Sequence, residues 1–190
     1  MSGWIEVIAG SMYSGKTEEL IKRVRRSEFA KLKTQVFKPK LDNRYHETNV
    51  ASHDQSQIKA IALKHINDVW DHLNDDTQVV GFDEGQFFTQ DLVNVCRDLA
   101  ARGLRVIVAG LDMDWRGQPF EPIPTLMAIA EDVSKPRAIC TSCGNLASYT
   151  QKLRGSGSQI EIGAIDNYEA RCRLHFKPVI EETVGTAIFI

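Results

Sequence analysis

Short apolar runs alternate with helical segments along the first two thirds of the chain. Strands are predicted from apolar or β-branched runs, and helices from apolar positions spaced three and four residues apart. The predicted strands are residues 4–9, 35–38, 78–83 and 104–110; the predicted helices begin at residue 17 and cover 65–73 and 89–102. Strands that alternate with helices predict an α/β fold with a mostly parallel sheet.

The pattern changes in two places. Residues 40–56 are polar and lack a regular period, so a loop is predicted there. Beyond residue 136, cysteine, glycine and serine become more frequent and the helical period fades. We therefore expect an α/β domain over residues 1–136, a small second module over 137–178 and a poorly held tail over 179–190.

Composition and charge narrow the class of protein. The 190 residues suffice for one domain with a small appendage, and 43% hydrophobic with 25% charged residues excludes collagen-like, coiled-coil and fully disordered chains. The net charge of −2 disfavours a strongly basic nucleic-acid binder. A basic cluster on the first predicted helix is interpreted as a solvated face; it comprises Lys22, Arg23, Arg25 and Arg26.

The chain shows no sign of membrane insertion or export. No apolar run approaches the roughly 20 residues that cross a bilayer. The N-terminus lacks the basic stretch and the long apolar core of a signal peptide. We therefore expect a soluble cytoplasmic protein that binds neither nucleic acid nor membranes.

A glycine-rich segment lies between the first predicted strand and the first predicted helix. It fits the phosphate-loop pattern G-x-x-x-x-G-K-[ST] in full, with Gly10, Ser11, Met12, Tyr13, Ser14, Gly15, Lys16 and Thr17. Glycines let the backbone curl so that its N–H groups point at phosphate oxygens, and the helix N-terminus adds positive potential. Lys16 supplies a charge for the β- and γ-phosphates, and the Thr17 hydroxyl can bind Mg²⁺. The segment predicts binding of a nucleoside triphosphate with Mg²⁺.

The predicted strand at 78–83 ends in two adjacent carboxylates, Asp83 and Glu84. In phosphate-loop proteins an aspartate at this place reaches the hydrated Mg²⁺, and we assign that role to Asp83. Glu84 can act as a general base on a hydroxyl or on water. These residues alone do not distinguish between water and a substrate hydroxyl as the phosphoryl acceptor.

Three of the four cysteines, with one histidine, have the spacing of a zinc site. Cys140 and Cys143 form a Cys-x-x-Cys pair, and further along the chain Cys172 and His175 form a Cys-x-x-His pair. Two such knuckles provide the three sulfurs and one nitrogen of a structural zinc site, which would hold together a module with little core. A redox pair or unliganded cysteines are the alternatives. Cys96, within a predicted helix, is interpreted as a core residue.

Together these segments resemble the type II thymidine kinases, the bacterial and animal cytosolic family. The resemblance rests on residues 10–20, 82–88 and 110–117 and on the two knuckles. It implies a phosphate-loop, parallel-sheet α/β domain with a zinc-binding, lid-bearing second domain, and transfer of the ATP γ-phosphate to the 5′-hydroxyl of thymidine. By the same resemblance Glu84 is the catalytic base. The segment that matches the ATP and Mg²⁺ site comprises Asp83, Glu84, Gly85 and Gln86.

The resemblance also implies a thymidine pocket. Its matching positions are Met12, Phe87, Leu111, Trp115, Phe120, Thr150 and Tyr168, with Asp42 and Arg44 near the sugar and phosphates. Flat aromatic side chains suit a pyrimidine base, and the glycine- and serine-rich stretch at 154–158 suits a lid over it. In this family phenylalanine is more usual than Trp115 and Tyr13. Glycine is more usual in the lid stretch that holds Ala164 and Ile165.

Beyond the substrates, the resemblance implies a homotetramer and feedback inhibition by thymidine triphosphate. Two other functions compete with the kinase. A phosphate-loop ATPase with a structural zinc module would use Asp83 and Glu84 to activate water, although 190 residues leave little room for coupling domains. A nucleic-acid-binding zinc module would need clustered basic and aromatic residues, whereas Glu161, Asp166 and Glu169 offset the basic residues there.

Overall fold

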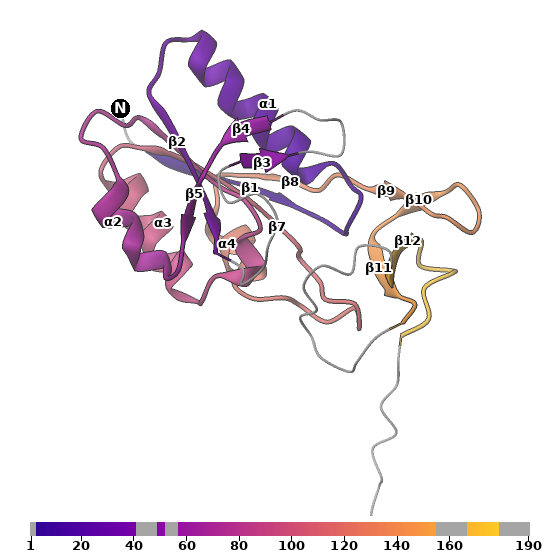
Figure 1. Ribbon diagram of the computed structural model, residues 1–190. Helices are drawn as coiled ribbons and strands as arrows, with labels where there is room; N and C mark the ends of the chain where they lie inside the picture. Colours follow the sequence, from indigo (N-terminus) through magenta and orange to yellow (C-terminus); the bar gives the residue numbers. More distant parts are fainter. Residues whose placement is uncertain (1–2, 41–48, 52–56, 155–166, 179–190) are drawn as a thin grey trace, which may run out of the picture.

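The computed structural model describes residues 3–40, 49–51, 57–154 and 167–178 (Figure 1). Within these ranges a six-stranded parallel sheet forms the centre of the molecule, in the order β5-β2-β6-β7-β1-β8. Its strands are β1 (Trp4–Ala9), β2 (Thr34–Pro39), β5 (Ile61–Leu63), β6 (Val79–Phe82), β7 (Arg105–Gly110) and β8 (Asp132–Ser134). The four predicted strands and the parallel α/β fold are confirmed.

Helices cover both faces of this sheet, as the two apolar faces of a parallel sheet require (Figure 1). One face is covered by α1 (Lys16–Phe29), and the other by η1 (Ile66–Asp68), α2 (Val69–His72), α3 (Asp91–Ala101) and α4 (Ile123–Ile129). Alternate residues of β1 serve the two cores: Val7 packs with α3 and α4, and Ile8 packs with α1. The three predicted helices are confirmed, although 65–73 begins as a 3₁₀ turn.

The segment that the sequence predicts as a loop contains two short strands. β3 (Asn49–Ala51) pairs antiparallel with β4 (Gln57–Lys59), so the loop prediction is wrong over 49–51. Residues 41–48 and 52–56 lie outside the described ranges. A three-residue strand has no measurable period, and its pairing depends on the partner strand. For the same reason the pattern of apolar and polar positions does not predict β5 and β8, which are also three residues long.

The second module lies beside the carboxyl ends of the sheet strands and consists of two small antiparallel pairs (Figure 1). β9 (Ala138–Ile139) pairs with β10 (Leu146–Ala147), and β11 (Tyr149–Lys152) pairs with β12 (Tyr168–Arg171). Among the described residues of this module, the buried apolar cluster consists of small side chains, namely Ala138, Cys140, Ala147, Ala170 and Cys172. So small a core needs an additional staple. The predicted tail at 179–190 lies outside the described ranges.

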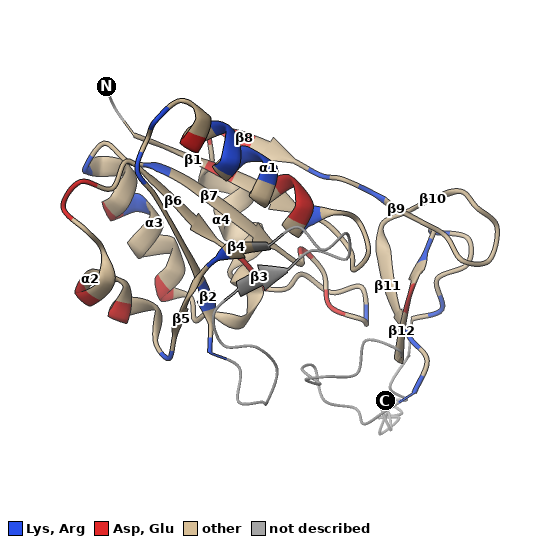
Figure 2. Cartoon of the chain, turned by 45° about the horizontal axis from the view of Figure 1, so that its top comes forward, with Lys and Arg blue, Asp and Glu red and all other residues tan. Residues whose placement is uncertain are grey.

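Both signs of charge occur on α1 (Figure 2). Lys22, Arg25 and Arg26 are exposed, as the solvated-face interpretation requires. For Arg23 that interpretation is wrong, because its side chain is only 14% exposed and reaches the buried Glu6 of β1. Among the described residues, no helix is long and apolar enough to cross a bilayer.

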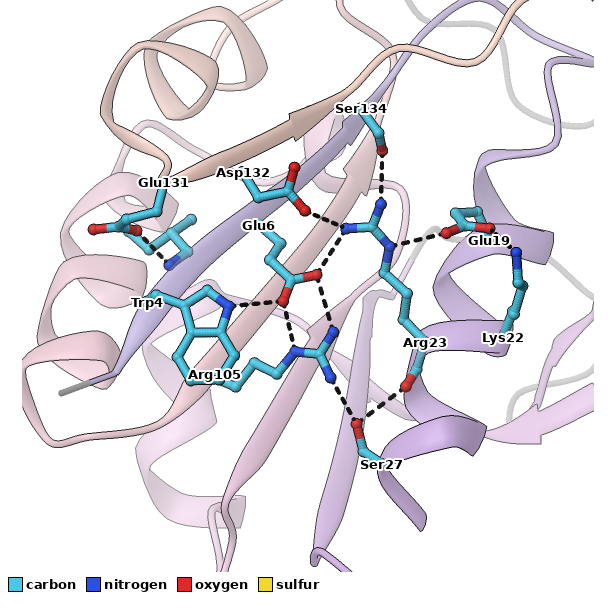
Figure 3. A network of polar contacts seen from close by, with 11 residues as sticks. Trp4, Glu6, Glu19, Lys22, Arg23, Ser27, Arg105, Glu131, Asp132 and Ser134 are labelled. Atoms are coloured by element: carbon cyan, nitrogen blue, oxygen red, sulfur yellow. Dashed lines mark hydrogen bonds and ion pairs between the residues drawn. The ribbon is translucent and has the colours of Figure 1, made fainter. Parts of the chain in front are cut away.

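Glu6 is the centre of a polar network between the sheet and α1 (Figure 3). Its carboxylate accepts hydrogen bonds from Arg23 Nη1 at 2.7 Å, from Arg105 Nε at 2.6 Å and from Trp4 Nε1 at 2.7 Å. Arg23 also reaches Ser134 Oγ at 3.0 Å. Burial by itself would raise the pKa of Glu6, but hydrogen bonds from Arg105, Trp4 and Arg23 outweigh it and lower that pKa. The network fastens α1 to β1, β7 and β8.

Candidate active site

The predicted site residues follow three adjacent strands of the sheet. The phosphate loop follows β1, Asp83 and Glu84 follow β6, and Leu111 follows β7, which lies between those two strands. β1 and β7 run in register from Trp4 opposite Arg105 to Ala9 opposite Gly110, so their carboxyl ends coincide. In open α/β sheets, ligands bind in the crevice at these carboxyl ends.

The phosphate loop is closed by contacts among its own residues. Gly15 adopts φ 83°, a left-handed conformation that suits glycine, and α1 begins at the next residue. Lys16 Nζ and Ser14 Oγ both donate to the backbone oxygen of Ser11, each at 2.8 Å. Burial lowers the pKa of Lys16, an effect that the carboxylates of Glu84 and Asp83 oppose. The loop therefore presents a partly buried cation at a helix N-terminus, which favours a polyanion.

Thr17 and Asp83 meet at the base of the loop. Thr17 Oγ1 donates to the Asp83 carboxylate, with both oxygens at 3.3 Å. Burial and the neighbouring charge of Glu84 raise the pKa of Asp83 to about 7. A buried carboxylate beside a hydroxyl oxygen is a donor set that suits Mg²⁺, and a bound cation would favour the ionised form of Asp83.

Glu84 is held by Gln86. The Glu84 backbone is left-handed, with φ 52° and ψ 41°, and turns the chain from β6 into the 3₁₀ turn η2 (Gly85–Phe87). Gln86 Nε2 donates to Glu84 Oε2 at 2.5 Å, and Gln86 Oε1 accepts the N–H of Leu111 at 2.9 Å. Gly110 permits this approach, because a Cβ there would lie 3.0 Å from Gln86 Oε1. Gln86 thus positions the Glu84 carboxylate through the end of β7.

Asp112 is a buried residue of this site for which the sequence analysis gave no role. It is 4% exposed and forms an ion pair with Lys135, and its charge acts on Lys16. Its Oδ1 atom has no hydrogen-bond partner among the described residues. Asp112 follows a buried strand as Asp83 does, and this shared pattern was the signal that could have identified it. It adds a third carboxylate near the phosphate loop.

The predicted thymidine residues fall into three groups. Phe87 and Phe120 form an edge-to-face pair with ring centroids 6.3 Å apart, and the Phe87 N–H donates to the Glu84 backbone oxygen at 3.0 Å. Trp115 is 5% exposed, and the cationic groups of Arg116 and Lys152 lie 4.5 Å and 4.8 Å from its ring centroid. Since Lys152 belongs to β11, Trp115 also joins the loop after β7 to the second module.

The third group joins the second module to the phosphate loop. Thr150 Oγ1 accepts the backbone N–H of Met12 at 3.0 Å. The backbone oxygen of Tyr168 accepts the Tyr13 hydroxyl at 3.1 Å. The remaining residues considered in the sequence analysis lie outside the described ranges: Asp42, Arg44, Ala164, Ile165 and residues 155–158.

The four predicted metal ligands converge in the second module. The ligand atoms of Cys140, Cys143, Cys172 and His175 all lie within 4.8 Å of one another. His175 Nδ1 is 3.3 Å from Cys172 Sγ and 3.8 Å from Cys140 Sγ, and Cys143 Sγ is 3.7 Å from Cys172 Sγ. Burial opposes ionisation of Cys140, but the backbone N–H groups of Cys172 and Ser142 lower its pKa to about 6.

Both knuckles have the same turn. The Gly144 N–H donates to the Cys140 carbonyl and the Phe176 N–H donates to the Cys172 carbonyl, each at 2.9 Å. Gly144 has φ 73°, which explains a glycine at this position. A closed set of three sulfurs and one nitrogen fits tetrahedral zinc with no position left for water. Cys96, by contrast, is fully buried in α3, and burial raises the pKa of its thiol.

Comparison with known proteins identifies the family to which the chain belongs. The sequence matches the thymidine kinase family over residues 3–176. A thymidine kinase of Bdellovibrio bacteriovorus is 57% identical over 179 residues, which span 94% of this chain and 88% of that protein. A thymidine kinase of a Rhodothermus species is 50% identical over 176 residues, which span 93% of this chain and 82% of that protein. The resemblance inferred from the motifs is confirmed, and the chain belongs to the thymidine kinase family.

Proposed function

We propose that the chain transfers the γ-phosphoryl group of ATP to the 5′-hydroxyl of thymidine, which yields thymidine monophosphate and ADP. The observation that carries this proposal is the position of Glu84. Its carboxylate accepts a hydrogen bond from Gln86 at 2.5 Å, and its charge opposes the burial that lowers the pKa of the phosphate-loop Lys16. Glu84 also immediately precedes the turn that carries Phe87. A candidate base thus lies between a triphosphate site and an aromatic pair.

The phosphate side of the reaction belongs to the loop and the acids behind it. Backbone N–H groups of residues 10–17, apart from that of Met12, which donates to Thr150, would neutralise the triphosphate together with the Lys16 ammonium. Thr17 and Asp83 would hold Mg²⁺, and the bound ion would balance charge on the phosphates. Gly85 and Gln86 complete the predicted ATP segment. Because phosphoryl transfer depends mainly on positioning and charge, these groups should contribute more than the strength of the base.

Glu84 would accept the proton of the nucleoside hydroxyl. As the 5′-oxygen forms its bond to the γ-phosphorus, the bond from that phosphorus to the β-phosphate oxygen breaks, and ADP leaves. The proton moves from the 5′-hydroxyl to a Glu84 carboxylate oxygen. Gln86 keeps that carboxylate in place by donating to Oε2 and by anchoring itself on Leu111 N.

The thymine base would lie against the aromatic pair of Phe87 and Phe120. Its predicted neighbours are Met12, Leu111, Trp115, Thr150 and Tyr168, with Asp42 and Arg44 toward the sugar and phosphates. The contacts of Met12 with Thr150 support a pocket walled by both modules, because they bring β11 against the phosphate loop. The glycine- and serine-rich stretch at 154–158, which the sequence predicts as a lid, would close this pocket.

The proposal also includes a structural zinc ion, a cytoplasmic location, a homotetramer and feedback inhibition. The Cys₃His cluster would hold a structural zinc ion that stabilises a second domain over residues 137–178. Cysteines that serve as metal thiolates, without a disulfide, suit the reducing cytoplasm. Family membership supports a homotetramer and feedback inhibition by thymidine triphosphate.

A coupled assay of ADP release tests the function. ADP formation from ATP and Mg²⁺ is measured with and without thymidine, and the nucleotide product is identified by chromatography. We expect ADP release that depends on thymidine and equals the thymidine monophosphate formed. ADP release that is indifferent to thymidine would instead support the phosphate-loop ATPase.

A further inference from the structure

The phosphate loop is held from outside at two consecutive residues. Thr150 Oγ1 on β11 accepts the Met12 N–H at 3.0 Å, and the Tyr168 backbone oxygen on β12 accepts the Tyr13 hydroxyl at 3.1 Å. β11 and β12 pair with each other, and each of these two strands makes one of the two contacts. Two attachment points fix orientation as well as distance, which a single hydrogen bond does not.

The hairpin that makes these contacts is itself rigidly connected to the metal knuckles. The Thr141 N–H donates to the Ala170 backbone oxygen at 3.1 Å, and the Lys177 N–H donates to Gln151 Oε1 at 2.8 Å. Tyr149 stacks on Phe176 with ring centroids 4.5 Å apart. The hairpin therefore moves with the knuckles, and its hold on the phosphate loop depends on the fold of the whole second module.

The geometry of the loop indicates that this hold preserves a shape that can bind ATP. Lys16 is the first residue of α1, and Thr17 Oγ1 lies 3.3 Å from the Asp83 carboxylate. The Met12 N–H donates to Thr150 Oγ1, so this N–H serves the contact with β11, and the other loop amides are the ones that would face phosphate. Tyr13 is a non-glycine residue with φ 64°, a strained conformation that persists only where its surroundings enforce it.

We propose that Tyr13 is a positioning residue for ATP: with Thr150, its hydroxyl forms a two-point latch that fastens the phosphate loop to the second module. The inference rests on the proposed role of this loop in binding ATP. The latch lowers the conformational freedom that the loop loses when a triphosphate binds, and so increases affinity by preorganisation. Because Tyr13 is 39% exposed, water partly replaces its bond, and the effect of removing the bond is moderate.

The test is Tyr13→Phe in the full, zinc-loaded chain, with binding of a non-hydrolysable ATP analogue and Mg²⁺ measured by calorimetry without thymidine. We expect affinity about two- to fivefold weaker, in line with the loss of one partly exposed hydrogen bond. Amide exchange over residues 10–15 should become faster, while the thermal midpoint stays unchanged. Tyr149→Phe is the matched control, because it removes a hydroxyl from the same hairpin away from the loop, and should leave both readouts unchanged.

Thr150→Val provides a second, independent measurement, since it keeps the side-chain shape and removes the acceptor for Met12. We expect the same kind of affinity loss, and a double variant that loses less than the product of the two single effects, because the first change already loosens the latch. Unchanged analogue affinity and unchanged exchange in Tyr13→Phe would overturn the proposal. Turnover of the unsubstituted protein with thymidine judges the proposed function separately, since the latch measurement involves neither thymidine nor turnover.

Discussion

At the scale of the residue, the site depends on side chains with strained or buried surroundings. Glu84 has a left-handed backbone, which a residue with a Cβ adopts at a cost of about 1 kcal/mol. In return, the turn directs its carboxylate toward Gln86 and toward the charge of Lys16. Trp115 is buried, and the cationic groups of two side chains lie over its ring. These contacts hold the ring in place beside the candidate site.

Glu84→Gln tests the assignment of the base. The amide keeps the size of the side chain but cannot accept a proton, so kcat should fall by about 10²- to 10⁴-fold. Affinity for the ATP analogue should not fall, because Lys16 and the loop amides are untouched. Steady-state kinetics and calorimetry measure the two effects. Glu28→Gln, an exposed position at the end of α1, is the control, and near-normal turnover of Glu84→Gln would refute the assignment.

At the scale of the element, β1 and α1 support the phosphate loop between them. β1 pairs with β7 and β8, and α1 packs over it, so the loop joins two elements that are both fixed. Glu6 links these elements below the loop through Arg23 and Arg105 (Figure 3). Arg23 belongs to α1 and Arg105 belongs to β7, and the Glu6 carboxylate forms an ion pair with each of them. The rigidity of the loop at its two ends depends on this network.

Glu6→Gln should destabilise the fold. The variant keeps the shape of the side chain but removes the carboxylate that pairs with Arg105 and with Arg23, and Arg23 then keeps only its ion pairs with Glu19 and Asp132. The expected loss is about 2 kcal/mol, less than for a fully buried pair, because Arg23 and Arg105 remain 14% and 22% exposed. Urea unfolding at neutral pH measures it. Asp75→Asn, at an exposed position, is the control and should leave the free energy of unfolding nearly unchanged.

The same network predicts a dependence on pH. The pKa of Glu6 is lower in the folded chain than its ordinary value of 4.5, so unfolding takes up a proton as the pH falls. Its contribution to stability is therefore complete above pH 4.5 and is lost as the pH falls through the lower, folded pKa. The stability difference between the unsubstituted chain and Glu6→Gln should shrink below pH 4.5. A difference that stays constant between neutral and acidic pH would contradict this account.

At the scale of the whole molecule, the candidate site lies between two modules whose apolar cores differ in size. The main sheet has two large apolar cores, whereas the second module packs three alanines and two cysteines. The small module nevertheless supplies Thr150, Tyr168 and Lys152 to the contacts around the phosphate loop and Trp115. Its fold must therefore be stabilised by the metal cluster if the site is to keep its shape.

Cys143→Ser tests this dependence. A serine hydroxyl is a poor zinc ligand, so bound zinc should fall well below one ion per chain in elemental analysis. Thymidine-dependent turnover should fall with it, while the main unfolding transition of the sheet domain remains. Ser142→Ala changes the same turn without removing a ligand and should retain zinc. The zinc site would be refuted if the unsubstituted protein, purified without chelators, contained no zinc.

The sequence by itself determined the elements and motifs whose signals are local. Apolar runs of four to six residues predicted β1, β2, β6 and β7, because burial on both faces of a parallel sheet demands such runs. The phosphate loop, the acids after β6 and the two knuckles were recognisable because their spacing follows from the ligand each would hold. These motifs also sufficed to identify the family.

Only the tertiary structure decided which distant residues meet. It turned Arg23 inward onto Glu6, paired Asp112 with Lys135, and paired β3 with β4. It also brought Thr150 and Tyr168 onto the phosphate loop, across more than a hundred residues of chain. Such contacts depend on the packing of whole elements, and no local pattern of apolar and polar positions records which partner a side chain will find.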